Sequence, residues 1–465
     1  MNFIRNFNGR KYTGDTFEIR QYKPHYQSLP SQNSKVPARC DIYHGNAGYF
    51  LLSSSTQVVK LYRDTRIGAW EVNKNEQSRK LERLRRHLND GTMDLSPYSL
   101  KVPASHYVSE TQNALEVEIL FRQRPLLVAL TPHIPRQGDY LSHEVIDTSL
   151  LLVRDQQDNA RAYINACRHR GARLAEGRGH KRSFSCPFHA WNWSLDGKIV
   201  ARPNSHEGFE AVDDCYDSLI ELPCYEIAGL IFVLLEGDDI ELKVQDLMGA
   251  SLPDIENYNI ANTSYIDSRT TELNCNYKFF LDGFAETYHI APLHKETISP
   301  FYYSNSTLVD RLGEVVHLVS PRKTIDKEFE KDRAEQGALL PYCTTEYLLA
   351  PNVLLTHQVD HIQFWTVYPV DGANRCRIEL NVFWPKPMDE EDKRKAKLNV
   401  DLVWQVTTEE DFPQSVAIHR NLMSGAIPDI VFGQNEPALI YYHQNIAAAI
   451  DSDKLIPLVT LHDTD

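Results

Sequence analysis

The sequence predicts an α+β protein in which a small antiparallel β domain is joined to a larger α+β domain, whose antiparallel sheet is flanked by helices. Short apolar runs separated by turn residues follow one another from residue 148 to 237, at a density typical of an antiparallel sandwich or barrel. After residue 242, strand-like runs at 362–368 and 377–384 occur together with helical periods at 278–289 and 389–404. The 465 residues, at ~150 per domain, suffice for two large domains or about three.

The charge balance and the apolar pattern exclude several classes of protein. Lys and Arg number 49 against 63 Asp and Glu, so the net charge of −14 disfavours binding to nucleic acid. No window approaches the ~18–20 apolar residues of a membrane span, and the N-terminus lacks the apolar core of a signal peptide. We therefore expect a cytoplasmic protein with no membrane contact. The eight cysteines are too sparse for a disulfide scaffold, so a cysteine pair among histidines indicates a metal site.

The first 92 residues differ from the rest because they are polar and hold one helical period, at 75–89. There Leu81, Leu84 and Leu88 are spaced i, i+3 and i+7 among basic residues. One interpretation is a basic amphipathic helix for a partner or a membrane surface. The interpretation that we favour is a solvated helix on a loosely folded extension. We expect residues 1–92 to be poorly ordered, and a chain beginning at Met93 to keep its fold and activity.

Two Cys–His pairs stand close together in the β-rich segment. Cys167 and His169 are followed, after sixteen residues, by Cys186 and His189. Structural zinc also takes two cysteines and two histidines, but a zinc finger groups its cysteines in one pair and its histidines in the other. Here each loop supplies one of each, which suits a two-iron cluster with both thiolates on one iron and both imidazoles on the other. Neutral imidazoles remove negative charge from such a cluster and raise its reduction potential.

This segment resembles the Rieske [2Fe–2S] motif, Cys-x-His-x15–17-Cys-x2-His. Its sequences Cys-Arg-His-Arg-Gly and Cys-Pro-Phe-His-Ala-Trp resemble the form found in oxygenase α subunits. Respiratory-chain Rieske proteins carry two further cysteines in these loops, where this chain has Ala172 and Phe188. The departure argues against a quinol-oxidising membrane complex. The resemblance implies one Rieske cluster with four ligands: Cys167, His169, Cys186 and His189.

A second group of metal-binding side chains lies about a hundred residues further along the chain. Glu286 and His289 are one helical turn apart, and Pro292 is expected to bend the helix and bring His294 back to the same point. Two imidazoles with one carboxylate form the facial triad of non-haem Fe(II) oxygenases, which leaves coordination positions open. A His-x4-His pair by itself is a weak signal, so the expectation of iron depends on the Rieske motif upstream.

Residues 276–294 are similar to the iron-binding motif of the Rieske ring-hydroxylating oxygenases, Asn-Trp-Lys-x3-[Asp/Glu]-Asn-x2-[Asp/Glu]-x2-His-x4-His. The resemblance implies that His289 and His294 bind a mononuclear Fe(II). It also implies a catalytic role for Glu286 as the carboxylate that links an iron-ligand histidine to a Rieske histidine of the neighbouring subunit. Two positions depart from the motif: Tyr277 stands in place of Trp and Gly283 in place of Asn.

The third iron ligand in this family is an Asp in a pattern like Glu-Asp-x8-Arg-x-Leu, placed before the last helix. Here Glu410 and Asp411 are followed by Arg420 and Leu422 at the matching offsets. The resemblance therefore implies Asp411 as the third ligand. Glu409 and Glu410 are its rivals, and a solvated turn charge is the alternative for each.

The resemblance implies an oxidoreductase that uses O2 to hydroxylate an organic, aromatic substrate, as in aromatic hydrocarbon catabolism. We expect electrons from NAD(P)H through a separate flavin-containing reductase, with or without a ferredoxin. The reason is that this chain shows no Gly-x-Gly-x-x-Gly motif opening a βαβ unit. Family members form head-to-tail trimers, so we expect a homotrimer or an α3β3 assembly with a small β subunit.

Three alternatives remain open. The first is a Rieske monooxygenase that demethylates an amine or ether, or hydroxylates a quaternary amine. The second is a non-catalytic Rieske electron carrier, which would need a far shorter chain and would leave His289, His294 and Asp411 unexplained. The third is a binding module stabilised by zinc.

The resemblance also implies a catalytic sheet of the helix-grip type and an order of domains. After the extension we expect lead-in helices at 93–125 that pack on the catalytic domain, a Rieske domain at 126–240 and a catalytic domain at 241–465. In the last, His317 and His361 lie in apolar, strand-like surroundings and are candidates for a pocket wall, although packing explains them as well. The same two interpretations hold for four aromatic residues: Phe279, Phe280, Phe284 and Trp365.

Overall fold

The computed structural model describes residues 74–461 except 213, 333–335 and 451–456, together with four short strands nearer the N-terminus. The chain divides into two compact units, Met1–Ile42 with Leu52–Val59 and Tyr43–Leu51 with Lys60–Asp465. In the first unit the strands pair antiparallel: β1 (Ile4–Phe7) with β2 (Arg10–Thr13), and β3 (Asp41–Ile42) with β4 (Leu52–Ser53). The remainder of the expected poorly ordered extension, up to residue 73, lies outside the described residues.

Between residues 126 and 233 the second unit is built of small antiparallel sheets, as the sequence predicts. The largest has the strand order β10-β7-β8-β9-β14, and two others have the orders β15-β16-β6 and β11-β12-β13. The chain can turn tightly between β12 and β13 because Gly197 adopts a φ of +77°, and a Cβ there would lie 2.6 Å from the ring of Tyr163. The bounds are β6 (Leu126–Leu130), β7 (Asp139–Val145), β8 (Thr148–Arg154), β9 (Ala160–Ile164), β10 (Arg178–His180), β11 (Phe184–Ser185), β12 (Asn192–Trp193), β13 (Ile199–Ala201), β14 (Glu221–Leu222), β15 (Cys224–Ile227) and β16 (Leu230–Val233).

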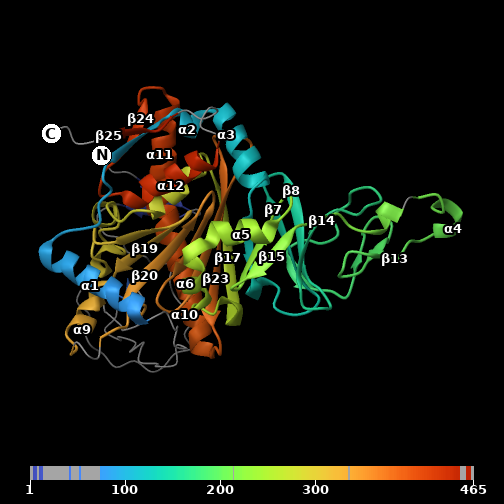
Figure 1. The fold of residues 1–465 in the computed structure, drawn as a ribbon, viewed down its shortest axis with the longest axis horizontal. Coiled ribbons are helices and arrows are strands. Elements are labelled where there is room, and N and C mark those ends of the chain that lie inside the picture. The colour runs from blue at the N-terminus through green and yellow to red at the C-terminus, as the bar shows by residue number, and fades with distance from the viewer. Residues whose placement is uncertain are drawn as a thin grey trace. The chain divides into compact units, whose positions relative to one another are not determined.

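A seven-stranded antiparallel sheet forms the centre of the larger domain, with the order β17-β23-β22-β21-β20-β19-β18 (Figure 1). Strands that follow one another in the chain are neighbours from β18 to β23, while the long β17 closes one edge by pairing with β23. The predicted strands at 362–368 and 377–384 are confirmed as β22 and β23. The bounds are β17 (Thr263–Leu273), β18 (Leu308–Leu312), β19 (Val315–Pro321), β20 (Cys343–Leu349), β21 (Val353–His357), β22 (Ile362–Pro369) and β23 (Cys376–Pro385).

Helices cover both faces of this sheet because its side chains alternate between two apolar cores. On one face Leu354 and Trp365 belong to a core with residues of α7 (Lys278–Phe284), α10 (Glu390–Val406) and α12 (Pro437–Ala449). On the other face Leu355 and Phe364 pack with residues of α5 (Ile240–Met248) and α6 (Leu252–Glu256). The α+β class with an antiparallel sheet is therefore confirmed.

Helix α10 confirms the helix that the sequence predicts at 389–404. It begins with a capping box, in which the Asp389 carboxylate accepts a hydrogen bond from the Asp392 backbone N–H at 2.8 Å and the Asp392 carboxylate accepts from that of Asp389. A π-helical turn, η9 (Thr407–Asp411), follows directly and leads into α11 (Phe412–Met423). No helix among the described residues combines the length and the apolar character that a membrane span requires.

Residues 93–125 supply a strand as well as helices. Strand β5 (Ser99–Pro103) pairs antiparallel with both β24 (Asp429–Phe432) and β25 (Val459–Leu461). A segment near residue 100 is thereby held beside segments after residue 428. Helices α2 (Ser105–Val108) and α3 (Glu110–Glu116) follow and end in a π-helical turn at Val117–Arg122. The domain boundaries that we expected remain a prediction.

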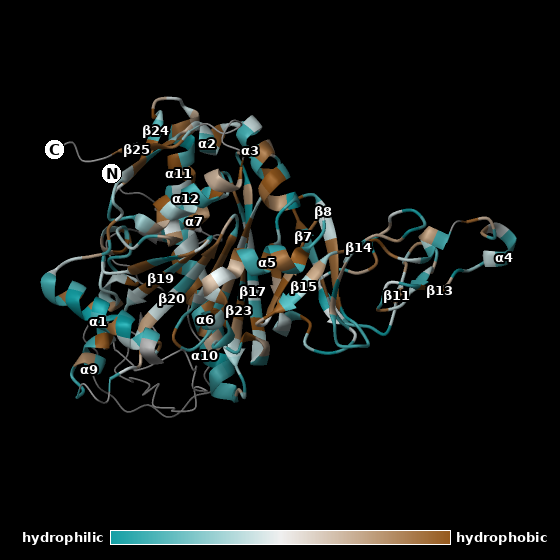
Figure 2. Cartoon of the chain, in the orientation of Figure 1, coloured by the Kyte–Doolittle hydropathy of each residue, from teal (hydrophilic) through white to brown (hydrophobic). Residues whose placement is uncertain are grey.

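The structure differs from our expectation at residues 74–92. Helix α1 (Lys74–Asp90) is largely hydrophilic (Figure 2), yet its narrow apolar stripe is buried. Leu81 is 5% exposed and Leu84 is fully buried. They pack in a core with Leu308 of β18 and Val319 of β19. The spacing i, i+3 therefore marks a docking face and not a solvated helix.

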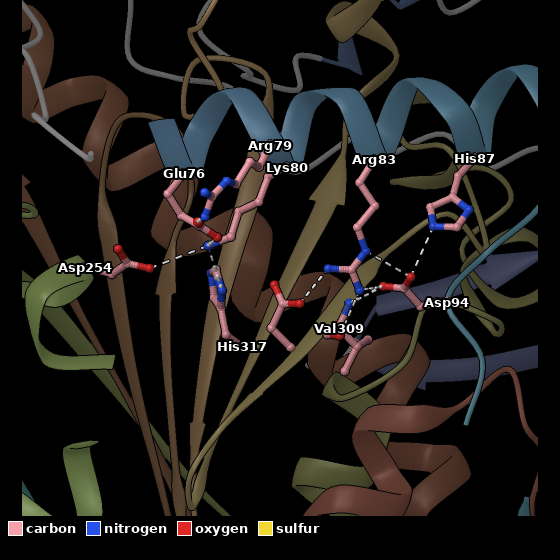
Figure 3. A network of polar contacts seen from close by, with 10 residues as sticks. Glu76, Arg79, Lys80, Arg83, His87, Asp94, Asp254, Val309 and His317 are labelled. Atoms are coloured by element: carbon pink, nitrogen blue, oxygen red, sulfur yellow. Dashed lines mark hydrogen bonds and ion pairs between the residues drawn. The ribbon is translucent and has the colours of Figure 1, made fainter. Parts of the chain in front are cut away.

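Polar contacts fix the same helix along its length (Figure 3). The Arg83 guanidinium forms ion pairs with Asp94 and with Asp310 on β18. Lys80, only 6% exposed, lies 3.5 Å from Asp254 and 3.3 Å from Nδ1 of His317. Two of the basic residues that suggested a solvated face, Lys80 and Arg83, thus pair with groups of the larger domain. Helix α1 is therefore packed into this unit, where we expected a loosely folded extension.

Candidate metal centres and the adjoining cavity

The two predicted Rieske loops share one backbone pattern. In each, the cysteine N–H donates to the carbonyl five residues later: Cys167 to Ala172 at 2.9 Å and Cys186 to Trp191 at 2.8 Å. The fourth residue after each cysteine donates back to the cysteine carbonyl and adopts a left-handed conformation, at Gly171 (φ +75°) and Ala190 (φ +57°). Two equivalent turns therefore present one cysteine and one histidine each.

The side chains of these loops fit a two-iron cluster. Cys167 and Cys186 are 2% and 4% exposed, and the rings of His169 and His189 lie 4.5 Å apart. Nδ1 of both histidines is buried without a hydrogen-bond partner. Buried polar atoms are rarely left unsatisfied, so two such nitrogens beside two buried thiols match the ligand set of a Rieske cluster. Burial, together with His189 and Arg170, lowers the pKa of His169 and favours the neutral form that binds metal.

The second predicted centre is built differently from the continuous helix that we expected over 278–289. Helix α7 ends at Phe284, and the short α8 (Ile290–Leu293) begins after His289, with Pro292 inside it. The Glu286 carboxylate ends the helical path because it accepts hydrogen bonds from the backbone N–H groups of Tyr288 and, at 3.0 Å, His289. Glu286 and His289 therefore meet across a turn instead of along one helix face.

Carboxylates orient both imidazoles of this centre in the same way. His289 Nδ1 donates to Oε1 of Glu286, and His294 Nδ1 donates to Oε2 of Glu410 at 2.6 Å. A carboxylate can only accept, so Nδ1 of each ring carries a proton and Nε2 is the nitrogen that faces the metal position. The Nε2 atoms of His289 and His294 lie 3.5 and 3.1 Å from Oδ1 of Asp411. Ligand atoms of these three residues all lie within 4.8 Å of one another.

The π-helical turn η9 separates the roles of the three candidate acids at 409–411. Asp411 points to the two imidazoles, whereas Glu410 contacts the far nitrogen of His294 and accepts from Thr297 at 2.9 Å. Glu409 is exposed and accepts from Gln405 at 3.3 Å. Of the rivals that the sequence left open, the geometry brings Asp411 into the triad. The role of Glu410 in orienting His294 has no signature in the sequence.

The electrostatics of the triad fit a divalent metal. Burial alone would lower the pKa of His294, which is 2% exposed, but the hydrogen bonds and charges of Asp411 and Glu410 outweigh burial and raise it. Two imidazoles and one carboxylate converge, and they are the donor set of a facial triad for non-haem iron. The residues therefore fit the iron that the sequence predicts.

A cavity of about 140 Å3 adjoins the triad and is lined by Glu286, His289, His294 and Asp411. Of the aromatic residues proposed as a wall, Phe284 lines the cavity, and Phe280 and Trp365 contact Phe284 with tilted rings. Phe279 stacks on Tyr107 instead. His361 lines the cavity as we considered, whereas His317 lies under α1. The sequence did not single out four polar residues of the wall: Arg322, Glu346, Gln358 and Asn399.

Comparisons with known proteins agree with this geometry. The profile of the Rieske [2Fe–2S] domain matches residues 125–226, and that of the ring hydroxylating alpha subunit (catalytic domain) matches residues 260–452. The chain belongs to the Rieske non-haem iron oxygenases, in the class of ring-hydroxylating α subunits. The cofactors of this class are a Rieske [2Fe–2S] cluster and a mononuclear iron.

Curated relatives match part of the chain. The carnitine monooxygenase oxygenase subunit of Escherichia coli (strain K12) is 29% identical over 222 residues, which cover 46% of this chain and 56% of the relative. The chain therefore spans little more than half the length of this relative. The putrescine 2-hydroxylase of Ralstonia nicotianae is 27% identical over 309 residues, covering 63% of this chain and 79% of the relative.

A solved structure shares the fold over a greater length. A quaternary ammonium Rieske monooxygenase in complex with an inhibitor superposes with a TM-score of 0.65 at 20% identity. The superposition covers 77% of this chain and 96% of that chain. The likeness shows that the Rieske and catalytic domains follow the common architecture of these enzymes.

Proposed function

We propose that this chain is the oxygenase component of a Rieske system that hydroxylates a small organic substrate with O2. Electrons come from NAD(P)H through a separate flavin-containing reductase, with or without a ferredoxin. The observation that carries the proposal is the convergence of His289, His294 and Asp411 beside a cavity, in a chain that also pairs two Cys–His loops. A non-catalytic electron carrier has no use for such a triad.

In this proposal two ligand sets have separate tasks. Cys167, Cys186, His169 and His189 hold the cluster, while His289, His294 and Asp411 hold the iron. When bound, the cluster supplies electrons one at a time and the iron supplies the centre that activates O2. The carboxylates of Glu286 and Glu410 hold the rings by Nδ1 and aim both Nε2 atoms at the metal position.

The substrate enters the cavity beside the triad, where apolar side chains such as Phe284 and Val403 exclude water. Insertion of one oxygen atom consumes one O2, two electrons and two protons, and releases the other atom as water. Dihydroxylation would leave both atoms in the product. Two of the relatives are named as a carnitine monooxygenase subunit and a putrescine 2-hydroxylase. The wall of the cavity also contains several polar side chains. Both observations favour monooxygenation of an amine over attack on an aromatic hydrocarbon.

Electron delivery between subunits gives Glu286 a second task in this proposal. Its carboxylate holds His289 from behind the metal position and is 12% exposed. A Rieske histidine of a neighbouring copy that reached the same carboxylate would complete a short hydrogen-bonded route between the two centres. We therefore propose a homotrimer or an α3β3 assembly arranged head to tail.

Spectroscopy and oxygen consumption together test the proposal. The purified protein is expected to be brown, with a Rieske-type visible spectrum and about three irons per chain. With a surrogate reductase it is expected to take up O2 in the presence of an amine from a substrate panel, and mass spectrometry of the product identifies the inserted oxygen. About two irons per chain, with no uptake, would favour the electron carrier. A colourless zinc protein would favour the binding module.

A further inference from the structure

On the face of the seven-stranded sheet that borders the cavity, the side chains change from apolar to polar along the strands. Strand register places Glu346 of β20 between Leu318 of β19 and Thr356 of β21, and Thr356 opposite Gln363 of β22. The row two residues further along the same face is apolar: Val316, Leu348, Leu354 and Trp365. A polar row therefore begins where the helices leave space for the cavity, and Glu346 is the acid in it.

Glu346 differs from the other buried acids of the described residues, each of which has a side-chain partner, including Asp139 with Arg136 and Asp360 with His361. Glu116 is paired with Lys278, Asp155 with Arg161, and Glu328 with Lys331. Glu346 is 9% exposed and lines the cavity, and no hydrogen bond or ion pair links its side chain to any other described residue. Burial raises its pKa to about 8. An unpaired buried carboxyl costs stability, and such groups are concentrated at binding sites.

We propose that Glu346 is the specificity-determining residue that binds a positively charged ammonium group of the substrate in the cavity beside the iron triad. The substrate class is thereby small amines and betaines. This inference rests on the proposed function, which makes the cavity the substrate site. A cation supplies the partner that Glu346 lacks, and an ion pair in a water-poor cavity is stronger than one at the surface.

Two further groups in the cavity suit a ligand of this kind. Arg322, 4% exposed, lines the same cavity and donates to the neutral side chains of Gln358 at 2.6 Å and Thr344 at 3.5 Å. Nδ2 of Asn399, on α10, is buried and has no acceptor among the described residues. A zwitterion, with an ammonium group and a carboxylate, matches the charges of this cavity.

Two matched pairs of probes test the charge preference without turnover. In each pair a tert-butyl group replaces a trimethylammonium group of the same shape: glycine betaine with tert-butylacetate, and choline with its neutral carbon isostere. Calorimetric titration into the anaerobic holoenzyme is expected to show tighter binding of the cation by at least about tenfold. Glu346→Gln should remove most of this preference. Glu272→Gln should keep it, because Glu272 is 40% exposed and pairs with Arg375 at the sheet edge.

The outcomes separate this inference from the proposed function. Equal binding of cation and isostere in both pairs, or no binding of either cation, overturns the role of Glu346. A cation preference that survives in Glu346→Gln also overturns it. Hydroxylation of a neutral compound, with no preference for cations in binding, would support the oxygenase function and contradict the proposed role of Glu346. A preference that depends on Glu346, in a protein that takes up no O2, would support the cation site and contradict the oxygenase.

Discussion

Single carboxylates decide how the iron ligands of this protein are oriented. Glu410 holds Nδ1 of His294 at 2.6 Å and is itself held by Thr297. Glu410→Gln keeps the size but removes the charge that fixes the ring, so iron should bind about 10–100-fold more weakly. Iron titration of the metal-depleted protein measures this. Glu409→Gln is the matched control, because Glu409 is exposed. Equal iron affinity in wild type and Glu410→Gln would contradict the orienting role.

The unpaired Glu346 makes stability depend on pH. Its pKa is about 8 in the folded chain against an ordinary value of 4.5, so between these values the folded state keeps a proton that the unfolded state has lost. The free energy of unfolding should therefore fall as pH rises through this window. In Glu346→Gln the free energy of unfolding should not show this fall, because glutamine does not titrate. The melting temperature of this variant should exceed that of wild type by a few degrees at about pH 8, and the gap should close near pH 5. A gap that does not depend on pH would show that Glu346 does not titrate in this window.

At the scale of elements, helix α1 tests whether the chain before Met93 is needed. Leu84 is fully buried against β18 and β19, so Leu84→Ala should cost about 2–5 kcal/mol of packing. Thermal unfolding followed by circular dichroism should show a lower melting temperature than for Arg79→Ala, whose side chain is 81% exposed. A chain beginning at Met93 should be less stable still, because it exposes the whole docking surface. If the melting temperature of Leu84→Ala equalled that of wild type, α1 would be a solvated helix and not a packed one.

The turn between α7 and α8 shows why helix prediction failed at the site itself. The period at 278–289 favours a continuous helix, but the Glu286 side chain competes for the backbone N–H groups of the next residues. Such competition depends on a rotamer that the sequence does not specify. The π-helical turn at Thr407–Asp411 is similar, because its extra residue per turn swings Asp411 and Glu410 to opposite sides of His294.

At the scale of the whole molecule, the parts with strong local signals could be predicted. The grouping of one cysteine with one histidine in each loop separated Cys167 and His169 from a zinc finger, and strand-like runs located β22 and β23. The cavity wall could not be predicted, because Arg322 and Glu346 come together only through the pairing of β19 with β20. The docking of α1 was missed for the same reason. The acids that pair with Arg83 are Asp94 and Asp310, and only the folded chain brings them next to this helix.

The proposed route of electrons between subunits makes a prediction about Glu286. Glu286→Gln removes the charge behind His289 while keeping the size of the side chain. Both centres should load with iron and the cluster should reduce normally, but reoxidation of the cluster should slow by orders of magnitude. Single-turnover mixing of the reduced protein with substrate and O2 measures that rate. Reoxidation at the wild-type rate would leave Glu286 as a local orienting group only.

The central claim is that one chain holds two independent metal centres with the ligands assigned above. The most direct test is iron content together with the Rieske electron paramagnetic resonance signal in His169→Ala and Asp411→Ala. His169→Ala should lose the signal and about two of about three irons, because it removes one of two imidazoles from the cluster. Asp411→Ala should keep the full signal and lose about one iron with all turnover. A normal Rieske signal in His169→Ala, or full iron and activity in Asp411→Ala, would contradict the account.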